Sequence, residues 1–247
     1  MNIALDIGTT RCKLDDGAKI AIFAHGSTDF AAQLPKEPVD WWIASVNRPA
    51  LKAFTQWAAQ TRPRDVLHVL TYETIPLRVN VEFPERVGMD RLLAALAVNR
   101  LRKPNRAAVV VDLGTALKVD LVDSEGVFQG GAIAPGIRMS AIAMEQQTDA
   151  LPELDVAPLL DELRTQQIPA IGKNTHEAIS SGLYWGTVGM IQELVTRVAQ
   201  EYGGRDAVDV FITGGGAETI ARELGPDFHC ESELVLKGIW ETVRAHD

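Results

Sequence analysis

Short apolar runs that end in an acidic residue and a glycine recur in the hydrophobic pattern of this chain. One run, Val109–Val111, is followed by the turn Asp112–Thr115 and then by a second apolar stretch. The chain begins in the same way, with an apolar run that leads into Asp6–Thr9. Apolar runs of this length bounded by turn residues predict buried strands, so each turn is predicted to join two strands into a hairpin. Asp112 lies 106 positions after Asp6, which indicates an internal duplication.

The rest of the pattern predicts strands and helices in a similar order in both halves. In the first half we expect strands over Ala18–Ala24, Trp41–Val46 and Val66–Leu70, and helices over Pro49–Gln60 and Leu92–Leu101. In the second half we expect strands over Gly126–Ala132 and Val208–Ile212, and helices over Ile137–Gln147, Asn174–Gln200, Ala217–Leu224 and Leu234–Ala245. An acidic stretch with prolines, Leu151–Gln167, is predicted to be a loop with a short helix.

This order of elements predicts the fold class. Three meandering strands followed by alternating helices and strands form the ribonuclease-H-like plan, and its duplication gives the actin-like ATPase fold. By analogy with known folds, we expect an α/β protein of two lobes with a nucleotide in the central cleft. The basic segment Arg102–Arg106 is the predicted boundary, so the lobes would be residues 1–105 and 106–247.

Each hairpin turn also has chemistry that suits a phosphate ligand. Glycine lets the backbone come close to a ligand, and exposed N–H groups in a turn can hold phosphate oxygens. The threonine hydroxyl adds a donor, and the aspartate can hold Mg²⁺ or a metal-bound water that bridges to phosphate. One such turn is common in ordinary hairpins. Two copies at corresponding places favour a functional site.

Composition excludes several other classes of protein. The 247 residues are 46% hydrophobic and carry a net charge of −9, which argues against binding to nucleic acid because phosphate backbones need a basic surface. Cys12 and Cys230 have no metal spacing and are expected to be free thiols in a reducing compartment. The first residues lack the features of a secretory signal, and no apolar run approaches the length of a membrane span. We therefore expect a cytoplasmic protein without a membrane partner.

Six segments in order resemble those of the type III pantothenate kinases, which belong to the acetate and sugar kinase, heat-shock chaperone and actin superfamily. The segments are Asp6–Thr10, Pro84–Arg91, Asp112–Ala116, Gly130–Gly136, Asn174–Gly182 and Thr213–Gly215. Each is weakly specific alone, whereas six with this spacing over nearly the whole chain are strongly specific.

The resemblance implies ATP-dependent phosphorylation of the primary hydroxyl of pantothenate to 4′-phosphopantothenate, the first step of coenzyme A biosynthesis. It implies that Asp90 is the general base and that the family's homodimers share their active sites. The implied pantothenate contacts are Gly88, Met89, Asp90 and Arg91, with Thr175 reaching the substrate of the neighbouring subunit. The implied ATP contacts are Asp6, Ile7, Gly8, Thr9, Thr10, Arg11, Cys12, Lys13 and Thr115. Asp6 would hold Mg²⁺ through water, and Asp112 a monovalent cation, K⁺ or NH₄⁺.

The chemistry of the residues fits these roles. A carboxylate that accepts the alcohol proton helps the oxygen to attack phosphorus, and helix N–H groups stabilise a carboxylate at a helix start such as Asp90. Arg91 offers a fork of donors for the pantothenate carboxylate. Without the resemblance, a helix N-cap at Asp90 and a solvated Arg91 would be the simpler interpretation. The scattered histidines make a zinc site improbable, and Trp41, Trp42 and Trp57 are expected to pack in the core.

Three departures from the family pattern bear on the site. Thr9 stands where the family usually has asparagine, and Val81, with Phe83 close by, stands where a tyrosine is common. Leu117 and Lys118 replace two threonines. Since Lys118 shares the strand parity of Asp112, our hypothesis is that its ammonium replaces the monovalent cation. A solvent-facing strand lysine is the alternative, and strong activation by K⁺ would contradict the hypothesis.

Two other functions stay open at this point. One is a superfamily kinase for another small alcohol, which the segment Gly88–Arg91 argues against and which a substrate comparison would decide. The other is a catalytically weak, nucleotide-binding regulatory relative, which the departures at Thr9, Val81 and Lys118 leave open. Replacing Asp90 by asparagine separates an enzyme from a regulator.

Overall fold

The computed structural model describes residues 1–148, 158 and 167–246. By its packing the chain forms two units, the first of Met1–Leu101, Gly126–Phe128 and Glu233–Asp247, and the second of Arg102–Glu125 and Gln129–Ser232. The first unit ends at Leu101, directly before the predicted boundary at Arg102–Arg106. The C-terminal segment was expected in the second lobe, but it packs in the first unit.

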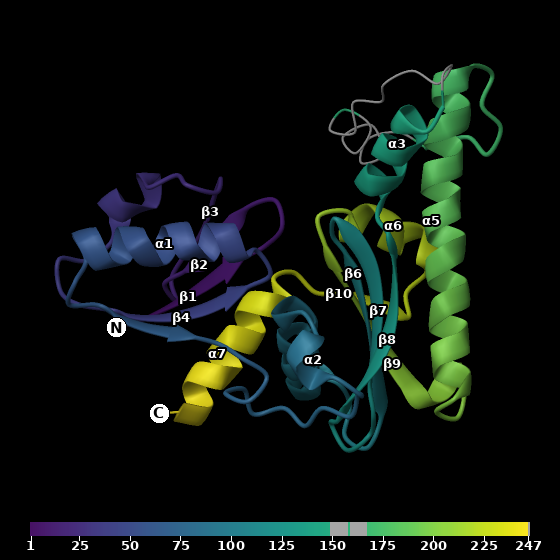
Figure 1. Cartoon of the computed structure of the whole chain (residues 1–247). Helices are drawn as coiled ribbons and strands as arrows, with labels where there is room; N and C mark the ends of the chain where they lie inside the picture. Colours follow the sequence, from purple (N-terminus) through teal and green to yellow (C-terminus); the bar gives the residue numbers. More distant parts are fainter. Residues whose placement is uncertain (149–157, 159–166, 247) are drawn as a thin grey trace. The chain divides into compact units, whose positions relative to one another are not determined.

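The first unit is built on a five-stranded sheet with the order β3-β2-β1-β4-β5 (Figure 1). Its strands are β1 (Asn2–Ile7), β2 (Cys12–Asp15), β3 (Ile20–Phe23), β4 (Asp40–Ser45) and β5 (Val66–Val69). Strand β1 pairs antiparallel with β2 and parallel with β4. The helices of this unit are α1 (Arg48–Thr61), α2 (Met89–Leu101) and α7 (Leu234–His246), with short 3₁₀ turns at Asp29–Gln33 and Pro84–Arg86.

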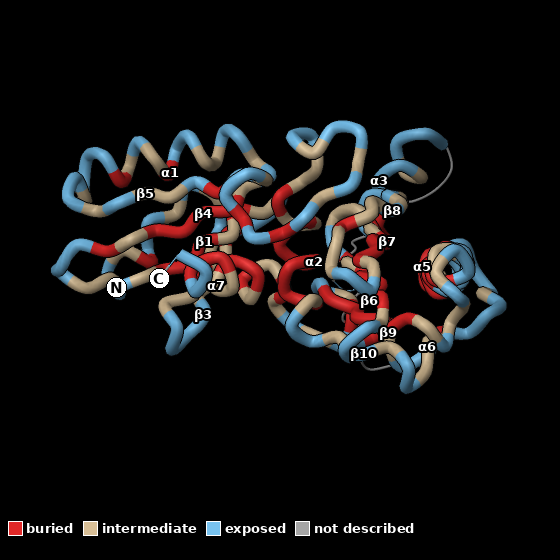
Figure 2. Tube along the Cα trace, turned by 90° about the horizontal axis from the view of Figure 1, so that it is seen from below, coloured by how far each residue is buried: buried red, intermediate tan, exposed pale blue. Residues whose placement is uncertain are grey.

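Helices cover both faces of this sheet. Ile3, Leu5 and Ile7 share one buried cluster with Phe54 and Trp57 of α1, while α2 and α7 contact the sheet through β1 and β4. Figure 2 shows buried positions along β1, β4 and α2. The expectation that the tryptophans pack in the core is confirmed, because Trp41 and Trp42 are buried and Trp57 packs against the same cluster. Since side chains alternate along a strand, Asp6 points away from α1, toward the face on which α7 packs.

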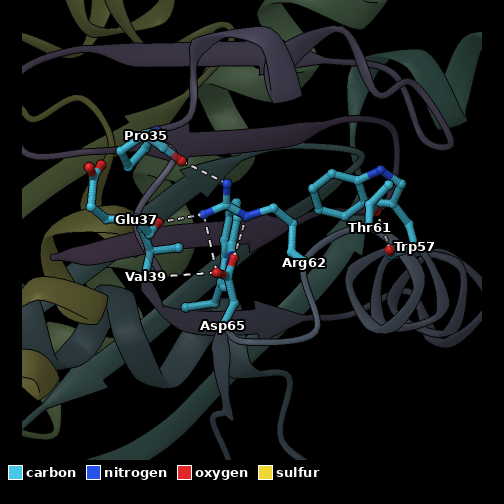
Figure 3. A network of polar contacts seen from close by, with 8 residues as sticks. Pro35, Glu37, Val39, Trp57, Thr61, Arg62 and Asp65 are labelled. Carbon is cyan, nitrogen blue, oxygen red and sulfur yellow. Dashed lines mark hydrogen bonds and ion pairs between the residues drawn. The ribbon is translucent and has the colours of Figure 1, made fainter.

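A polar network fixes one end of the first sheet (Figure 3). The Arg62 guanidinium donates to both carboxylate oxygens of Asp65 and to the carbonyls of Pro35 and Glu37. Asp65 also accepts hydrogen bonds from Trp41 Nε1 and the Val39 N–H. Burial opposes ionisation of Asp65, but these donors outweigh it and hold the pKa of the carboxyl below its ordinary value. The network therefore stabilises the loop that leads into β4.

The second unit repeats the plan of the first. Its sheet has the order β10-β9-β6-β7-β8, with strands β6 (Ala107–Leu113), β7 (Ala116–Val122), β8 (Phe128–Pro135), β9 (Val208–Gly214) and β10 (Phe228–Cys230) (Figure 1). Strand β6 pairs antiparallel with β7 and parallel with β9, as β1 does with β2 and β4. The predicted duplication is thereby confirmed. The helices are α3 (Ile137–Gln146), α5 (Thr175–Gln200) and α6 (Ala217–Leu224), with a 3₁₀ turn at Arg205–Ala207.

Several predicted element bounds differ from those observed. Strand β8 starts two residues later than predicted and runs on to Pro135, and α2 begins at Met89, before the predicted start at Leu92. Strand β10 was not predicted. The loop expected over Leu151–Gln167 lies almost entirely outside the described residues. In the part of the chain that the structure describes, none of the helices is long and apolar enough to cross a bilayer.

Candidate active site

The first predicted phosphate turn connects β1 to β2. The Gly8 N–H donates to the Arg11 carbonyl at 3.1 Å, which closes the turn, and a Cβ on Gly8 would lie only 3.2 Å from that oxygen. Thr9, Thr10 and Arg11 are exposed, while Ile7 and Cys12 are buried on the α1 side. The turn can therefore present two hydroxyls, a guanidinium and backbone N–H groups to an anion. Ile7 and Cys12 were among the predicted ATP contacts, but their buried side chains serve the core.

The Cys12 thiol is held in its neutral form. Burial is the main cause, and the negative charge of nearby Asp6 adds to it, so that the pKa of Cys12 is raised to about 11. Cys12 and Cys230 are free thiols, as predicted. A neutral, buried thiol suits packing rather than nucleophilic chemistry.

Asp6 and Lys13 lie directly opposite each other on β1 and β2. Both are half-buried, and both face away from the α1 cluster. The Lys13 ammonium donates to Glu233 Oε2 at 2.6 Å, just before α7. The predicted phosphate turn is thus connected to the C-terminal helix of the same unit.

Asp90 is the second residue of α2 and lies close to Gly88. Its Oδ1 accepts the Arg91 N–H at 2.9 Å and would lie 2.5 Å from a Cβ placed on Gly88, so a side chain at residue 88 would displace the carboxylate from this position. That same point on Gly88 is 3.7 Å from the Val46 side chain, and the Val46 N–H donates to the Ile7 carbonyl at 3.1 Å. The start of α2 therefore lies beside the ends of β1 and β4, next to the phosphate turn.

Met89 and Arg91 flank the predicted base differently. Met89 is buried, so its side chain packs beneath this region and does not line its surface. The Arg91 guanidinium lies over the ring of Phe128, with 5.5 Å between the guanidinium carbon and the ring centroid. Such a cation–π contact orients the planar guanidinium.

The second predicted turn connects β6 to β7 and is closed by an ion pair. The Lys118 ammonium donates to Asp112 Oδ2 at 2.6 Å, and the two residues lie opposite each other in the strand register. The Lys118 side chain is only 14% exposed and the Asp112 side chain 20%. Lys118 is thus a partner of Asp112 and not a solvent-facing lysine, which is the geometry that our hypothesis requires.

Glycines let the backbone approach this second turn closely. A Cβ on Gly136, which precedes α3, would lie 2.6 Å from the carbonyls of Gly114 and Thr115. Gly214 has a φ of +101°, and a Cβ there would lie 2.4 Å from the Leu113 carbonyl. The N-terminus of α3 therefore packs against Gly114 and Thr115, and the end of β9 packs against Leu113 just before them. Helix N-termini favour anions.

Thr175 is the first residue of α5. The Asn174 side chain caps this helix by accepting the Glu177 N–H at 2.9 Å, and Glu177 in turn accepts the Lys173 N–H at 2.7 Å. Thr175 is exposed. Its predicted contact with the substrate of a neighbouring subunit stays a prediction.

The described residues offer few protein ligands for a metal ion in this part of the molecule. Among the described residues, no three or more histidine, cysteine, aspartate or glutamate side chains converge on a point that could hold a metal ion. A single carboxylate such as Asp6 next to a phosphate-binding turn nevertheless fits Mg²⁺, because this ion usually keeps several waters and binds through one or two carboxylates and substrate phosphates. The oxygen donors at the first turn are of the right kind for Mg²⁺.

Comparison with known proteins agrees with this arrangement. The family profile described as "Type III pantothenate kinase" matches residues 23–197. The chain belongs to the type III pantothenate kinase family. A type III pantothenate kinase from Persephonella marina is 35% identical over 173 residues, which cover 70% of this chain and 63% of that protein. One from Syntrophotalea carbinolica is 36% identical over 223 residues, 90% of this chain and 83% of that protein.

The aligned part covers only 50–63% of the length of the Persephonella kinase and four other curated relatives. Among solved structures, a putative Baf family transcriptional activator from Campylobacter jejuni aligns over 99% of this chain and 98% of its own, with a TM-score of 0.65 and 17% identity. A putative 2-dehydro-3-deoxygalactonokinase from Sinorhizobium meliloti aligns over 100% of this chain and 99% of its own, with a TM-score of 0.53 and 15% identity. These similarities confirm the predicted actin-like kinase fold of this pantothenate kinase family member.

Two side chains at the first turn were missed in the sequence. His25 Nε2 lies 3.0 Å from the Gly8 carbonyl, and Glu233 binds Lys13. Neither residue lies at a motif spacing, because His25 follows β3 and Glu233 lies over 200 positions from the turn. Their contacts arise only when the strands pair and α7 packs.

Proposed function

We propose that this protein phosphorylates the primary hydroxyl of pantothenate with ATP, giving 4′-phosphopantothenate for coenzyme A synthesis. The observation that carries the proposal is the position of Asp90, whose carboxylate lies over Gly88 beside the strand ends that also hold the Asp6 turn. Family membership supports pantothenate as the substrate. A base beside a phosphate-binding turn is the arrangement that phosphoryl transfer to an alcohol needs.

In this proposal each residue of the first unit has a chemical role. Asp90 accepts the proton of the pantothenate hydroxyl as the oxygen attacks the γ-phosphorus, while the bond from the γ-phosphorus to the β,γ-bridging oxygen breaks and ADP leaves. Arg91 binds the pantothenate carboxylate with two donors, and its packing on Phe128 reduces the freedom lost on binding. The Gly8–Lys13 segment contacts the ATP phosphates, with Thr9 in place of the family's usual asparagine. Most of the rate enhancement would come from positioning and charge neutralisation.

Asp6 would hold the magnesium ion of MgATP, mainly through water. When bound, Mg²⁺ would neutralise charge that develops on the phosphate oxygens. The second turn would contribute Thr115 to nucleotide binding, and Asp112 would keep its charge balanced. We propose that the Lys118 ammonium supplies that balance in place of K⁺ or NH₄⁺, because it already donates to Asp112 at 2.6 Å.

We further propose that the active protein is a homodimer that associates through α5, with Thr175 reaching the partner's substrate. In support, Gly182, Gly186 and Gly189 lie on one exposed side of α5, and a Cβ on any of them would meet no atom within 4 Å. Small residues at this spacing allow close approach of a second helix. Gly186→Leu is expected to shift the protein toward monomer in sedimentation analysis, and an unchanged sedimentation coefficient would contradict this interface.

The function is tested by a coupled assay with MgATP and a panel of acceptors. Pantothenate should be phosphorylated at least 100-fold more efficiently than acetate, glucose or N-acetylmannosamine. Turnover of another small alcohol alone would point to a different superfamily kinase. Nucleotide binding without turnover of any acceptor would favour a regulatory protein.

A further inference from the structure

The ammonium of Lys13 is held by a carboxylate from the other end of the chain. It donates to Glu233 Oε2 at 2.6 Å, although 220 positions separate the two residues. The Lys13 side chain is 22% exposed and the Glu233 side chain 24%, so the pair is largely shielded from water, where an ion pair is stronger than at the surface. Both side chains still keep part of their surface in contact with solvent. A ligand that arrives from solvent can therefore reach the pair.

The position of Lys13 suits a phosphate ligand as well. Lys13 follows Cys12 at the end of the first turn and faces away from the α1 cluster. Its register partner on β1 is Asp6, so the Lys13 side chain lies on the face of the hairpin where the proposed function places MgATP. A lysine ammonium is a point charge that binds phosphate oxygens without a fixed geometry. The Glu233 carboxylate and the phosphates of ATP are therefore alternative partners for one ammonium.

Glu233 is kept in place by its backbone. It has a φ of +58°, a conformation that residues other than glycine rarely adopt, and its carbonyl accepts the Lys237 N–H at 3.0 Å as α7 begins. Helix α7 is seated closely on α2, since a Cβ on Gly238 would lie 2.1 Å from the Leu93 carbonyl. A glutamate held in this conformation points to a role for its side chain. Lys13, on its flexible four-carbon stem, is the partner that can move.

We propose that Lys13 exchanges partners when ATP binds, so that its ammonium leaves Glu233 for the phosphates and returns to Glu233 when the nucleotide departs. Glu233 is then a positioning residue that acts through Lys13 and sets the affinity of the first turn for nucleotide. Breaking the ion pair opposes the binding of ATP, and re-forming it favours the departure of ADP after transfer. This inference rests on the proposed contact of the Gly8–Lys13 segment with the ATP phosphates.

The test is the equilibrium affinity for adenylyl imidodiphosphate, an ATP analogue that resists phosphoryl transfer, measured by titration calorimetry in excess Mg²⁺ at constant ionic strength. Glu233→Gln removes the charge and keeps the size of the side chain, and Glu233→Gly suits the left-handed backbone. Both variants should bind the analogue about 10-fold more tightly, because no ion pair has to break. Glu233→Asp retains the carboxylate and should stay close to wild type. Glu37→Gln, which removes an exposed carboxylate elsewhere, is the control and should also bind like wild type.

A double-mutant cycle with Lys13→Met separates partner exchange from simple repulsion between Glu233 and the phosphates. Lys13→Met alone should bind the analogue more weakly than wild type. In the Lys13→Met protein, Glu233→Gln should increase the affinity far less than it does in the wild type, because only the repulsion is then relieved. An equal gain in both backgrounds, or Glu233 variants that bind no more tightly than wild type, would overturn the proposal.

The partner exchange and the proposed substrate can fail separately. Wild-type protein that phosphorylates pantothenate, while the Glu233 variants bind the analogue with unchanged affinity, would overturn the exchange alone. Wild-type protein that gives the expected affinities, yet does not phosphorylate pantothenate, would refute the proposed substrate and leave the role of Glu233 intact.

Discussion

Replacing Lys118 by threonine should make the enzyme dependent on potassium. The change restores one of the hydroxyls that the family usually carries here and removes the ammonium 2.6 Å from Asp112 Oδ2. The pair is mostly shielded, with 14% of the Lys118 side chain and 20% of the Asp112 side chain exposed, so the change would remove an ammonium from a carboxylate in a poorly solvated place. A hydrogen bond to a charged group contributes about 1.5–3 kcal/mol. That range corresponds to roughly 10–100-fold in an equilibrium constant.

Initial rates of pantothenate phosphorylation, with K⁺ exchanged for tetramethylammonium at constant ionic strength, measure this effect. Wild-type rates should be flat in K⁺. Lys118→Thr should lose about 10–100-fold in kcat/KM for ATP without K⁺ and recover most of it in K⁺. Lys52→Thr, which removes an exposed lysine on α1, is the matched control and should behave like wild type. Strong K⁺ activation of the wild type, or a Lys118→Thr enzyme that ignores K⁺, would refute the reasoning.

Three further predictions concern packing, pH and the first turn. Gly238→Ala should lower the free energy of unfolding by about 1–3 kcal/mol, because its Cβ meets the Leu93 carbonyl; denaturant titration measures the change. Asp65→Asn should destabilise the protein by about 2–3 kcal/mol at pH 7. Folding lowers the pKa of Asp65 below 3.8, so the stability difference between wild type and Asp65→Asn should persist above pH 4 and shrink as the pH falls through the native pKa. A stability difference that is unchanged at about pH 2–3 would contradict this prediction. His25→Leu should raise the KM for ATP about fivefold by releasing the Gly8 carbonyl, and His25→Gln, which retains a donor, should restore most of it.

The two hairpins could be predicted because their determinants are local. Each is marked by an apolar run that ends at Asp6 or Asp112, and the matching strand orders of the two sheets agree with the duplication that these runs indicate. Strand β10 could not be predicted, because three residues with two exposed side chains show no periodic pattern. The position of α7 could not be predicted either, because its apolar residues indicate that one side is buried but not which sheet it packs against.

The positions of two candidate site residues could be predicted because each depends on local sequence alone. Asp90 follows Gly88 at a helix start, and strand parity alone placed Lys118 on the face of Asp112. The contacts of His25 and Glu233 could not be inferred, because they join segments that only tertiary packing brings together. These contacts are made to Gly8 and Lys13, at the first turn.

The most direct test of the central claim is the turnover of Asp90→Asn with pantothenate and MgATP. Asparagine keeps the size of the side chain and an oxygen that can accept the Arg91 N–H, so folding and ATP affinity should be preserved. Loss of the general base should lower kcat by about 10²–10⁴-fold. A kcat within about threefold of wild type would contradict the assignment of Asp90 as the base.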